Sequence, residues 1–105
     1  MNNLESFINK KVIIRTDDPL LFIGTLSSSS DDGNFVVLTD ARKIFRWDWH
    51  YIERWARYGT LKSDKCTISD VVDSIGVKGM RQILLCTDEA VKCFSEVPAT
   101  PKEFL

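Results

Sequence analysis

The sequence predicts an α+β domain built on a strongly curved antiparallel sheet of small-barrel type, with two or three short helices. Three observations lead to this fold class: short β-branched and apolar runs alternate with turn residues, a glycine interrupts the second run, and the apolar spacing lengthens to three or four residues after Trp47. The chain has 105 residues, 44% hydrophobic and 28% charged, which suits one domain. We therefore expect a single domain over residues 1–98 and a mobile tail over residues 99–105.

The first third of the chain predicts a short helix followed by two strands. Apolar residues at helical spacing indicate one or two turns over residues 4–8. The β-branched run Lys11–Thr16 indicates a strand, which ends in the turn sequence Asp17-Asp18-Pro19. The next apolar run, Leu20–Ser27, indicates a second strand. Gly24 in its middle predicts a sharp bend, and hence a curved sheet.

A hairpin is expected after the second strand. The tract Ser27–Asn34 contains no apolar residue and includes Asp32-Gly33, a dipeptide typical of hairpin turns. It predicts that the chain turns directly back into a third strand over Phe35–Thr39. Strand-like alternation then continues over Ala41–Trp47.

A helix is expected from about Trp49 to Tyr58, where apolar residues recur at three- and four-residue spacing. Asp48 precedes it as an N-cap, and Gly59 follows it as a C-terminal stop. We expect the core side of this region to contain Trp47, Ile52, Ala56 and one of Trp49 and Trp55.

The second half gives a less uniform pattern. Over residues 67–75 the apolar positions fit a helix as well as a bulged strand, and the pattern leaves both open. The run Arg81–Cys86 predicts a buried strand. Thr87 predicts an N-cap for a short helix that ends at Val97-Pro98. The apolar face of that helix is expected to consist of Ala90, Val91, Cys93 and Phe94.

Aromatic and basic residues concentrate in one stretch. All three tryptophans, both tyrosines and the single histidine lie within residues 47–58. Within residues 42–58, five Arg and Lys against Asp48 and Glu53 give +3, so the rest of a chain whose total is −1 carries −4. Tyr and Trp offer large contact areas with few rotatable bonds, and Arg pairs with carboxylates and phosphates. We therefore expect a binding surface formed by Arg46, His50, Tyr51, Arg54, Arg57 and Tyr58.

Composition disfavours several classes of function. A pI near 5.8 argues against a protein that coats nucleic acid through bulk charge. No apolar run is long enough for a membrane helix, so we expect a cytoplasmic protein. Three cysteines without close spacing and one histidine predict no disulfide framework and no metal, and we expect no cofactor. No cysteine is predicted beside His50, so we do not expect an enzyme.

Two nucleic-acid hypotheses stay open beside protein binding. Arg42, Arg46 and Trp47 lie on a predicted strand and have the composition of a base-stacking and phosphate-binding surface. The stretch 71–84 also has features of a helix-turn-helix with Gly76 at its turn. In that interpretation the candidate groove-reading residues are Lys78, Arg81 and Gln82.

The order short helix, K-V-I-I-R-T, turn, L-L-F-I-G-T-L-S-S, hairpin and F-V-V-L-T-D-A-R resembles the start of an Sm-like small barrel. The resemblance covers the N-terminal half of the chain. It implies an N-terminal helix before a strongly bent five-stranded sheet, with binding of nucleic acid or a nucleotide, and a homo-oligomer, as expectations. An Sm-like chain places a second motif with a short Arg/Lys-Gly segment near its last strands, whereas here the Trp-rich helix intervenes.

A second resemblance covers residues 12–98. The segments V-I-I-R-T, F-I-G-T-L, V-V-L-T-D-A-R, R-W and C-T-D-E-A, followed by V-P, are together similar to a family of small uncharacterised proteins of bacteriophages and prophages. The resemblance implies the cytoplasm of a bacterial host cell as the setting and a host protein as the partner. From it we expect a non-catalytic protein that antagonises a host defence system, such as a CRISPR effector, through its Arg and aromatic surface.

Overall fold

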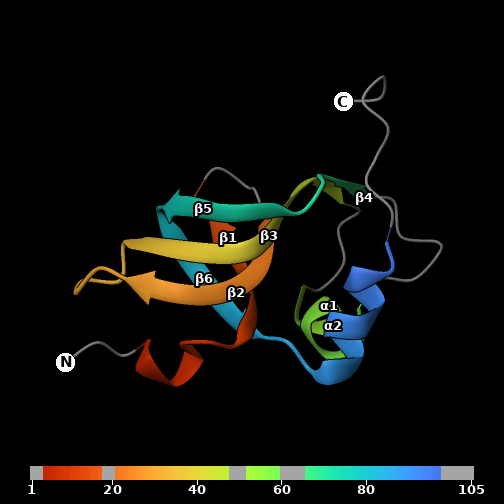
Figure 1. Cartoon of the computed structure of the whole chain (residues 1–105), viewed down its shortest axis with the longest axis horizontal. Helices are drawn as coiled ribbons and strands as arrows, with labels where there is room; N and C mark the ends of the chain where they lie inside the picture. The colour runs from red at the N-terminus through yellow and green to blue at the C-terminus, as the bar shows by residue number, and fades with distance from the viewer. Residues whose placement is uncertain (1–3, 18–20, 48–51, 60–65, 98–105) are drawn as a thin grey trace.

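The computed structural model describes residues 4–17, 21–47, 52–59 and 66–97 (Figure 1). A short 3-10 helix precedes three strands, and two α-helices and three further strands follow. The elements are η1 (Glu5–Phe7), β1 (Lys11–Thr16), β2 (Leu21–Ser29), β3 (Phe35–Trp47), α1 (Ile52–Tyr58), β4 (Cys66–Ile68), β5 (Val72–Lys78), β6 (Met80–Leu85) and α2 (Asp88–Ser95).

One antiparallel sheet contains all six described strands. The strands follow the order β4-β3-β2-β1-β6, and β5 pairs with the first part of β3. β5 and β6 are consecutive in the chain, yet they pair with different strands, β5 with β3 and β6 with β1. No pairing among the described residues joins β5 to β6, so the sheet is curved but open. The predicted α+β class, with a strongly curved antiparallel sheet, is confirmed.

The sheet curves where two residues interrupt the regular pairing of β2 and β3. Gly24 lies at a register shift between these strands, and a Cβ there would come within 2.9 Å of the Ala41 Cβ. Asp40 has a positive φ of 46° in the middle of β3. The residues up to Ala41 pair with β5, and those from Ile44 onward pair with β4. The two strands predicted here are therefore one bent strand, and the bend expected at Gly24 is confirmed.

Two hydrophobic clusters lie on opposite faces of the sheet, because successive side chains of a strand point to opposite sides. The first, which we call the barrel cluster, comprises Leu4, Val12, Ile14, Phe22, Leu26, Val36, Leu38, Ala41 and Val77. The second, the helix cluster, comprises Ile13, Leu21, Ile23, Ile44, Ile52, Trp55, Ala56, Ile68 and Phe94. α1 and α2 contribute to the helix cluster alone, so together they form a layer over that face (Figure 1).

Thr87 and Gly59 fix the ends of the two α-helices. Thr87 is the predicted N-cap of α2, and its Oγ1 accepts a hydrogen bond from the Ala90 N–H at 3.1 Å. The same hydroxyl donates to the Arg57 carbonyl near the end of α1. Gly59 follows α1 with a φ of 84°, which confirms the predicted C-terminal stop. The predicted start of that helix, from Asp48 to Tyr51, lies outside the described residues.

The structure decides one open assignment in the second half and corrects two predictions. Residues 67–75 contribute to β4 and β5, so the strand alternative holds. The helix-turn-helix interpretation of residues 71–84 is wrong, because these residues form β5 and β6 around a turn at Gly79. Their apolar side chains pack on the barrel cluster at strand spacing, as Ile75 and Val77 do. Arg81–Cys86 was predicted to be a buried strand, but β6 is only partly buried, and among the described residues it pairs only with β1.

Candidate functional site

The two sides of α1 differ in composition, because residues three and four positions apart share a face of a helix. The inner side packs on the helix cluster and consists of Ile52, Trp55 and Ala56. Trp55 is 1% exposed and meets the Phe94 ring edge to face, with 5.9 Å between ring centroids. The predicted core tryptophan is therefore Trp55. The outer side carries four exposed residues, and we call three of them, Arg54, Arg57 and Tyr58, the α1 basic face. The fourth is Glu53, which lies one turn before Arg57.

The α1 basic face combines charge with an aromatic ring. The guanidinium carbon of Arg57 lies 5.4 Å from the centroid of the Tyr58 ring, a cation–π distance. Tyr58 remains 47% exposed. At the border of the face, the Glu53 carboxylate accepts a hydrogen bond from the Gln82 amide of β6 at 3.4 Å. The face therefore offers a partner two guanidinium groups and a phenol.

The structure describes half of the predicted binding set. Arg54, Arg57 and Tyr58 are together on one surface. His50 and Tyr51 lie outside the described residues, and so do the side chains of Arg46 and Trp47. The backbone of β3 places Arg46 opposite Thr67 and Trp47 opposite Cys66 of β4.

Arg42, predicted as an alternative nucleic-acid contact, is 7% exposed. Its Nε donates to the Ser69 carbonyl at 2.8 Å, and its Nη1 donates to the carbonyls of Phe94 at 2.9 Å and Val97 at 2.7 Å. The last two carbonyls lie at the C-terminal end of α2, where the helix dipole stabilises a cation. This placement corrects the prediction, because the guanidinium of Arg42 joins β3 to α2 inside the protein and does not face a nucleic acid.

A second group of residues, four of them polar and exposed, lies at the end of the sheet remote from the helices, where three chain segments meet (Figure 1). The Gly79 N–H donates to the Asn34 carbonyl at 3.1 Å, and the Asp17 N–H donates to the Gly79 carbonyl at 3.1 Å. The Nε of Arg81 pairs with Oδ1 of Asp17 at 2.8 Å. We call this group the loop cluster: Asp17, Asn34, Lys78, Gly79 and Arg81.

Asp32 braces the hairpin side of the loop cluster. Its Oδ1 accepts hydrogen bonds from the Ser30 hydroxyl at 2.6 Å and from the Asn34 N–H at 2.9 Å. These two bonds favour the charged carboxylate and hold the pKa of Asp32 below its ordinary value. From the sequence, Lys78 and Arg81 were expected only as groove-reading residues of a helix-turn-helix, and the loop cluster was not predicted. The sequence feature that could have indicated this cluster is Lys78-Gly79, a Lys-Gly segment that follows the Trp-rich helix and precedes the last strand.

The titratable groups include one strongly shifted thiol. Burial raises the pKa of Cys86 to about 12, although the nearby Lys11 ammonium acts in the opposite direction. This thiol is therefore neutral at physiological pH and a poor nucleophile. Within the described segments, no group of three or more His, Cys, Asp and Glu side chains could hold a metal ion. The helices of those segments are all too short or too polar to cross a membrane.

Solved structures with a similar fold include an Sm protein. The crystal structure of a heptameric archaeal Sm protein is 19% identical, covers 80% of this chain and 96% of its own, and has a TM-score of 0.51. A structure described as the NatC complex bound to CoA is 13% identical, covers 88% of this chain and 94% of its own, and has a TM-score of 0.47. At such identities the likeness concerns the fold alone.

The fold and its surfaces define a small α+β protein in which an open, Sm-like sheet carries a layer of two helices. The chain belongs to the family described as a domain of unknown function, DUF6948, which matches residues 9–94. The match runs from the residues before β1 to Phe94 of α2, so it includes nearly all of both hydrophobic clusters. No curated protein matches the chain by sequence.

Proposed function

We propose that the protein is a non-catalytic binding protein and that the α1 basic face is its contact surface. The observation that carries the proposal is the joint exposure of Arg54, Arg57 and Tyr58 on a helix whose inner side is anchored by Trp55. Arginine and tyrosine are enriched among the residues that contribute most to binding energy. Presented on an ordered helix, they bind with less loss of conformational entropy than they would on a flexible loop.

Several contacts hold α1 in place. The Ala56 carbonyl accepts the Thr87 N–H at 2.8 Å, and the Arg57 carbonyl accepts the Thr87 hydroxyl. Just beyond the helix, Gly59 lies so close to Cys93 of α2 that an added Cβ would stand 2.6 Å from the Cys93 Sγ. A partner would therefore meet side chains whose backbone is already ordered.

The chemistry of the α1 basic face fits a partner that presents carboxylates. Guanidinium groups bind carboxylates in a bidentate manner, and a tyrosine ring covers apolar surface while its hydroxyl stays hydrated. In this proposal the partner is an acidic surface of a host protein, and binding antagonises a host defence system such as a CRISPR effector. The choice of partner rests on the resemblance to phage and prophage proteins.

The test is binding to host proteins captured from a bacterial lysate and then purified. The double variant Arg54→Glu/Arg57→Glu should bind the captured protein at least about tenfold more weakly, because it places acids against acids. The matched control Lys78→Glu/Arg81→Glu reverses two charges at the remote loop cluster and should bind like the wild type. A defence-system partner should be inhibited stoichiometrically and without turnover.

Unchanged binding by the α1 variant, with binding lost in the loop-cluster control, would show that the surface is wrongly assigned. Both variants change exposed residues, so each should stay folded, which urea titration checks. Arg81→Glu also removes the exposed ion pair with Asp17, which should lower the unfolding midpoint only slightly. Trp55→Ala is unsuitable as a test, because Trp55 belongs to the helix cluster and its loss would disturb the fold.

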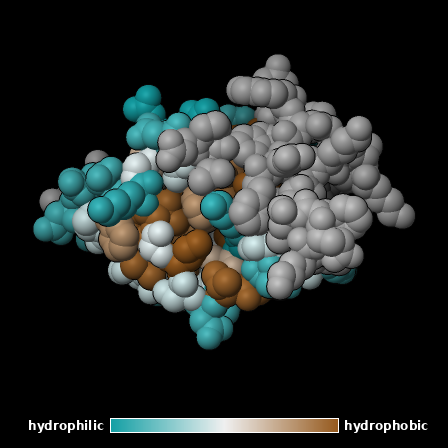
Figure 2. Space-filling view, turned by 90° about the horizontal axis from the view of Figure 1, so that it is seen from above, coloured by the Kyte–Doolittle hydropathy of each residue, from teal (hydrophilic) through white to brown (hydrophobic). Residues whose placement is uncertain are grey.

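A specific observation favours a second candidate, an Sm-like assembly that binds nucleic acid or a nucleotide. The sheet is similar to that of a protein described as heptameric. Among the described residues, β5 and β6 each pair on one side only, and they carry Val72 and Leu85, which are 41% and 49% exposed. Figure 2 views the molecule from the side on which β5 lies. In the described part of that surface, hydrophobic residues gather among hydrophilic ones. Open strand edges can pair between copies of a chain.

In this second candidate the loop cluster, with Lys78 and Arg81, supplies the nucleic-acid contact. Light scattering should then show a defined oligomer, and RNA affinity should fall steeply with added salt. The variant Lys78→Glu/Arg81→Glu should lose RNA binding, and Arg54→Glu/Arg57→Glu should retain it. A monomer that binds neither RNA, DNA nor cyclic nucleotides would exclude the candidate.

A further inference from the structure

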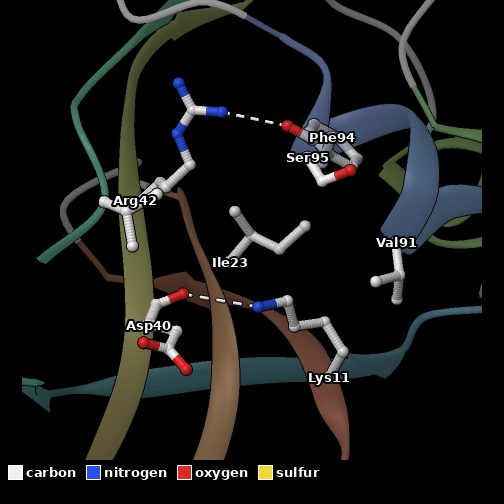
Figure 3. A pocket seen from close by; sticks show the side chains of 8 residues that line it. Lys11, Ile23, Asp40, Arg42, Val91, Phe94 and Ser95 are labelled. Carbon is white, nitrogen blue, oxygen red and sulfur yellow. Dashed lines mark hydrogen bonds between the residues drawn. The ribbon is translucent and has the colours of Figure 1, made fainter. Parts of the chain in front are cut away.

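A cavity of about 180 Å³ lies between the curved sheet and α2, away from the α1 basic face and the loop cluster (Figure 3). Its walls are mainly apolar and include Ile23 of β2, Val91 and Phe94 of α2, and Val71, which precedes β5. An apolar cavity of roughly 150 Å³ is large enough to bind benzene. The cavity therefore has room for one ring or a branched chain of similar size.

Lys11 stands at the mouth of this cavity. Figure 3 shows its ammonium directed toward Asp40, and it donates to the Asp40 carbonyl at 3.3 Å. This is one long hydrogen bond for a group with three donors, so the ammonium can take up further acceptors. Two other charged residues line the cavity. Arg42 donates to three backbone carbonyls, and the Asp40 carboxylate is turned away from Ile23 and Phe94.

A wider groove of about 540 Å³ adjoins the cavity, because both are lined by Lys11 and Val91. The groove adds Lys10 from the same end of β1, and Leu85 and Cys86 from the end of β6. Its one acidic residue in the described lining is Asp88, at the start of α2. Two ammonium groups and one carboxylate thus border the groove, and an apolar chamber opens beside it.

We infer that this cavity and groove form a binding site for a small amphipathic molecule with one apolar group and one carboxylate. The apolar group fills the space between Ile23, Val91 and Phe94, where it displaces water from contact with these hydrocarbon side chains. The carboxylate lies at the mouth and accepts hydrogen bonds from Lys11, with Lys10 adding a second positive charge. The site is independent of the α1 basic face and of the partner proposed for it.

The experiment is a titration of the full chain with 3-phenylpropionate, followed by methyl NMR signals of Ile23, Val71 and Val91. The expected dissociation constant is on the order of 1 mM, which is typical for a ligand of about a dozen non-hydrogen atoms. The neutral probe 3-phenylpropanamide should bind about tenfold more weakly, because it lacks the charge that Lys11 recognises.

Two kinds of variant separate the apolar and the charged contributions. Lys11→Met should weaken the acid about tenfold and leave the amide unchanged, since it keeps the apolar stem and removes the ammonium. Lys92→Met, which removes an exposed lysine that does not line the site, should leave both affinities unchanged. Val91→Phe should abolish binding of both probes because it fills the chamber.

Val71 is 59% exposed, so Val71→Phe narrows the cavity without altering the core. This variant replaces Val91→Phe in the test if Val91→Phe does not fold. The inference is overturned if the methyl signals do not shift. It is also overturned if acid and amide bind equally, or if the filled variants bind like the wild type.

Discussion

At the scale of single residues, Arg42 sets the position of the helix layer. The last carbonyls of a helix have no partner within the helix and usually meet water or a capping motif. Here the carbonyls of Phe94 and Val97 meet one guanidinium that projects from β3. The partners of Arg42 lie 27 to 55 residues further along the chain, which is why a local reading of the sequence placed this arginine on a binding surface.

We predict that Arg42→Met destabilises the fold by about 2–4 kcal/mol. Methionine keeps most of the side-chain volume, but it removes three hydrogen bonds to backbone carbonyls, two of them at the C-terminal end of α2. The measurement is the free energy of unfolding from urea titration at neutral pH. The matched change Arg54→Met, on the exposed side of α1, should stay within about 0.5 kcal/mol of the wild type. Equal effects of the two changes would contradict the role given to Arg42.

At the scale of elements, the predictable parts are those whose signals are local. Turn residues separate β1, β2 and β3, and Gly24 marks the bend, so these strands followed from the sequence. The sequence did not show that Phe35–Thr39 and Ala41–Trp47 form one bent strand. Residues 67–75 stayed open because β4 and β5 are defined by pairing with β3, which lies far away in the chain. Arg54, Arg57 and Tyr58 followed from helical spacing, whereas the loop cluster did not, because it forms only when three distant segments meet.

We predict that Gly59→Ala costs about 2–4 kcal/mol of stability. Two effects add at this position: the φ of 84° disfavours a side chain, and the new Cβ would overlap the side chain of Cys93 in α2. Gly33→Ala is the matched control, because φ is 75° and the nearest atom, in Leu4, would be 3.6 Å away. It should cost only about 1 kcal/mol, which reflects the backbone term alone. Thermal and urea unfolding of both variants measure the difference.

The hairpin between β2 and β3 should lose stability in acid. The pKa of Asp32 is lowered from its ordinary 3.8 in the folded protein, so the unfolded chain takes up a proton first as pH falls. The contribution of the Asp32 carboxylate to stability is therefore present above pH 3.8, and it is lost as pH falls through the lower pKa that this group has in the folded protein. Urea midpoints of wild type and Asp32→Asn should differ at pH 6, and the difference should shrink as pH falls below 3.8.

Asp31→Asn is the control for the hairpin experiment, since it makes the same change in charge one residue earlier. The two bonds from Ser30 and Asn34 go to Asp32, so they remain in this variant. A gap between wild type and Asp32→Asn that stays constant down to pH 2.5 would show that these bonds do not depend on the charge of Asp32.

At the scale of the whole molecule, the two hydrophobic clusters are joined through β1. Val12 and Ile14 pack in the barrel cluster, and Ile13 between them packs in the helix cluster. Loss of the β1 side chains of one cluster would therefore also disturb β1 where it contributes side chains to the other cluster. The helix layer and the curved sheet should therefore unfold together.

This coupling predicts a single unfolding transition. Tryptophan fluorescence, which includes Trp55 of the helix cluster, and far-ultraviolet circular dichroism should give the same urea midpoint. Ile13→Ala and Ile14→Ala should each cost about 3 kcal/mol and should each move both signals together, although they face different clusters. A fluorescence change that precedes the loss of strand signal would show that the helix layer unfolds separately.

The alternation in β1 also bears on how relatives of this chain can differ in length. Deleting one residue within Lys11–Thr16 would turn every later side chain of the strand to the opposite face and exchange Ile13 with its neighbours between clusters. Connections between elements carry no such constraint. Gaps in an alignment of related sequences should therefore fall between α1 and β4 or in the β2–β3 turn, and β1 should keep its length even where its residues have diverged.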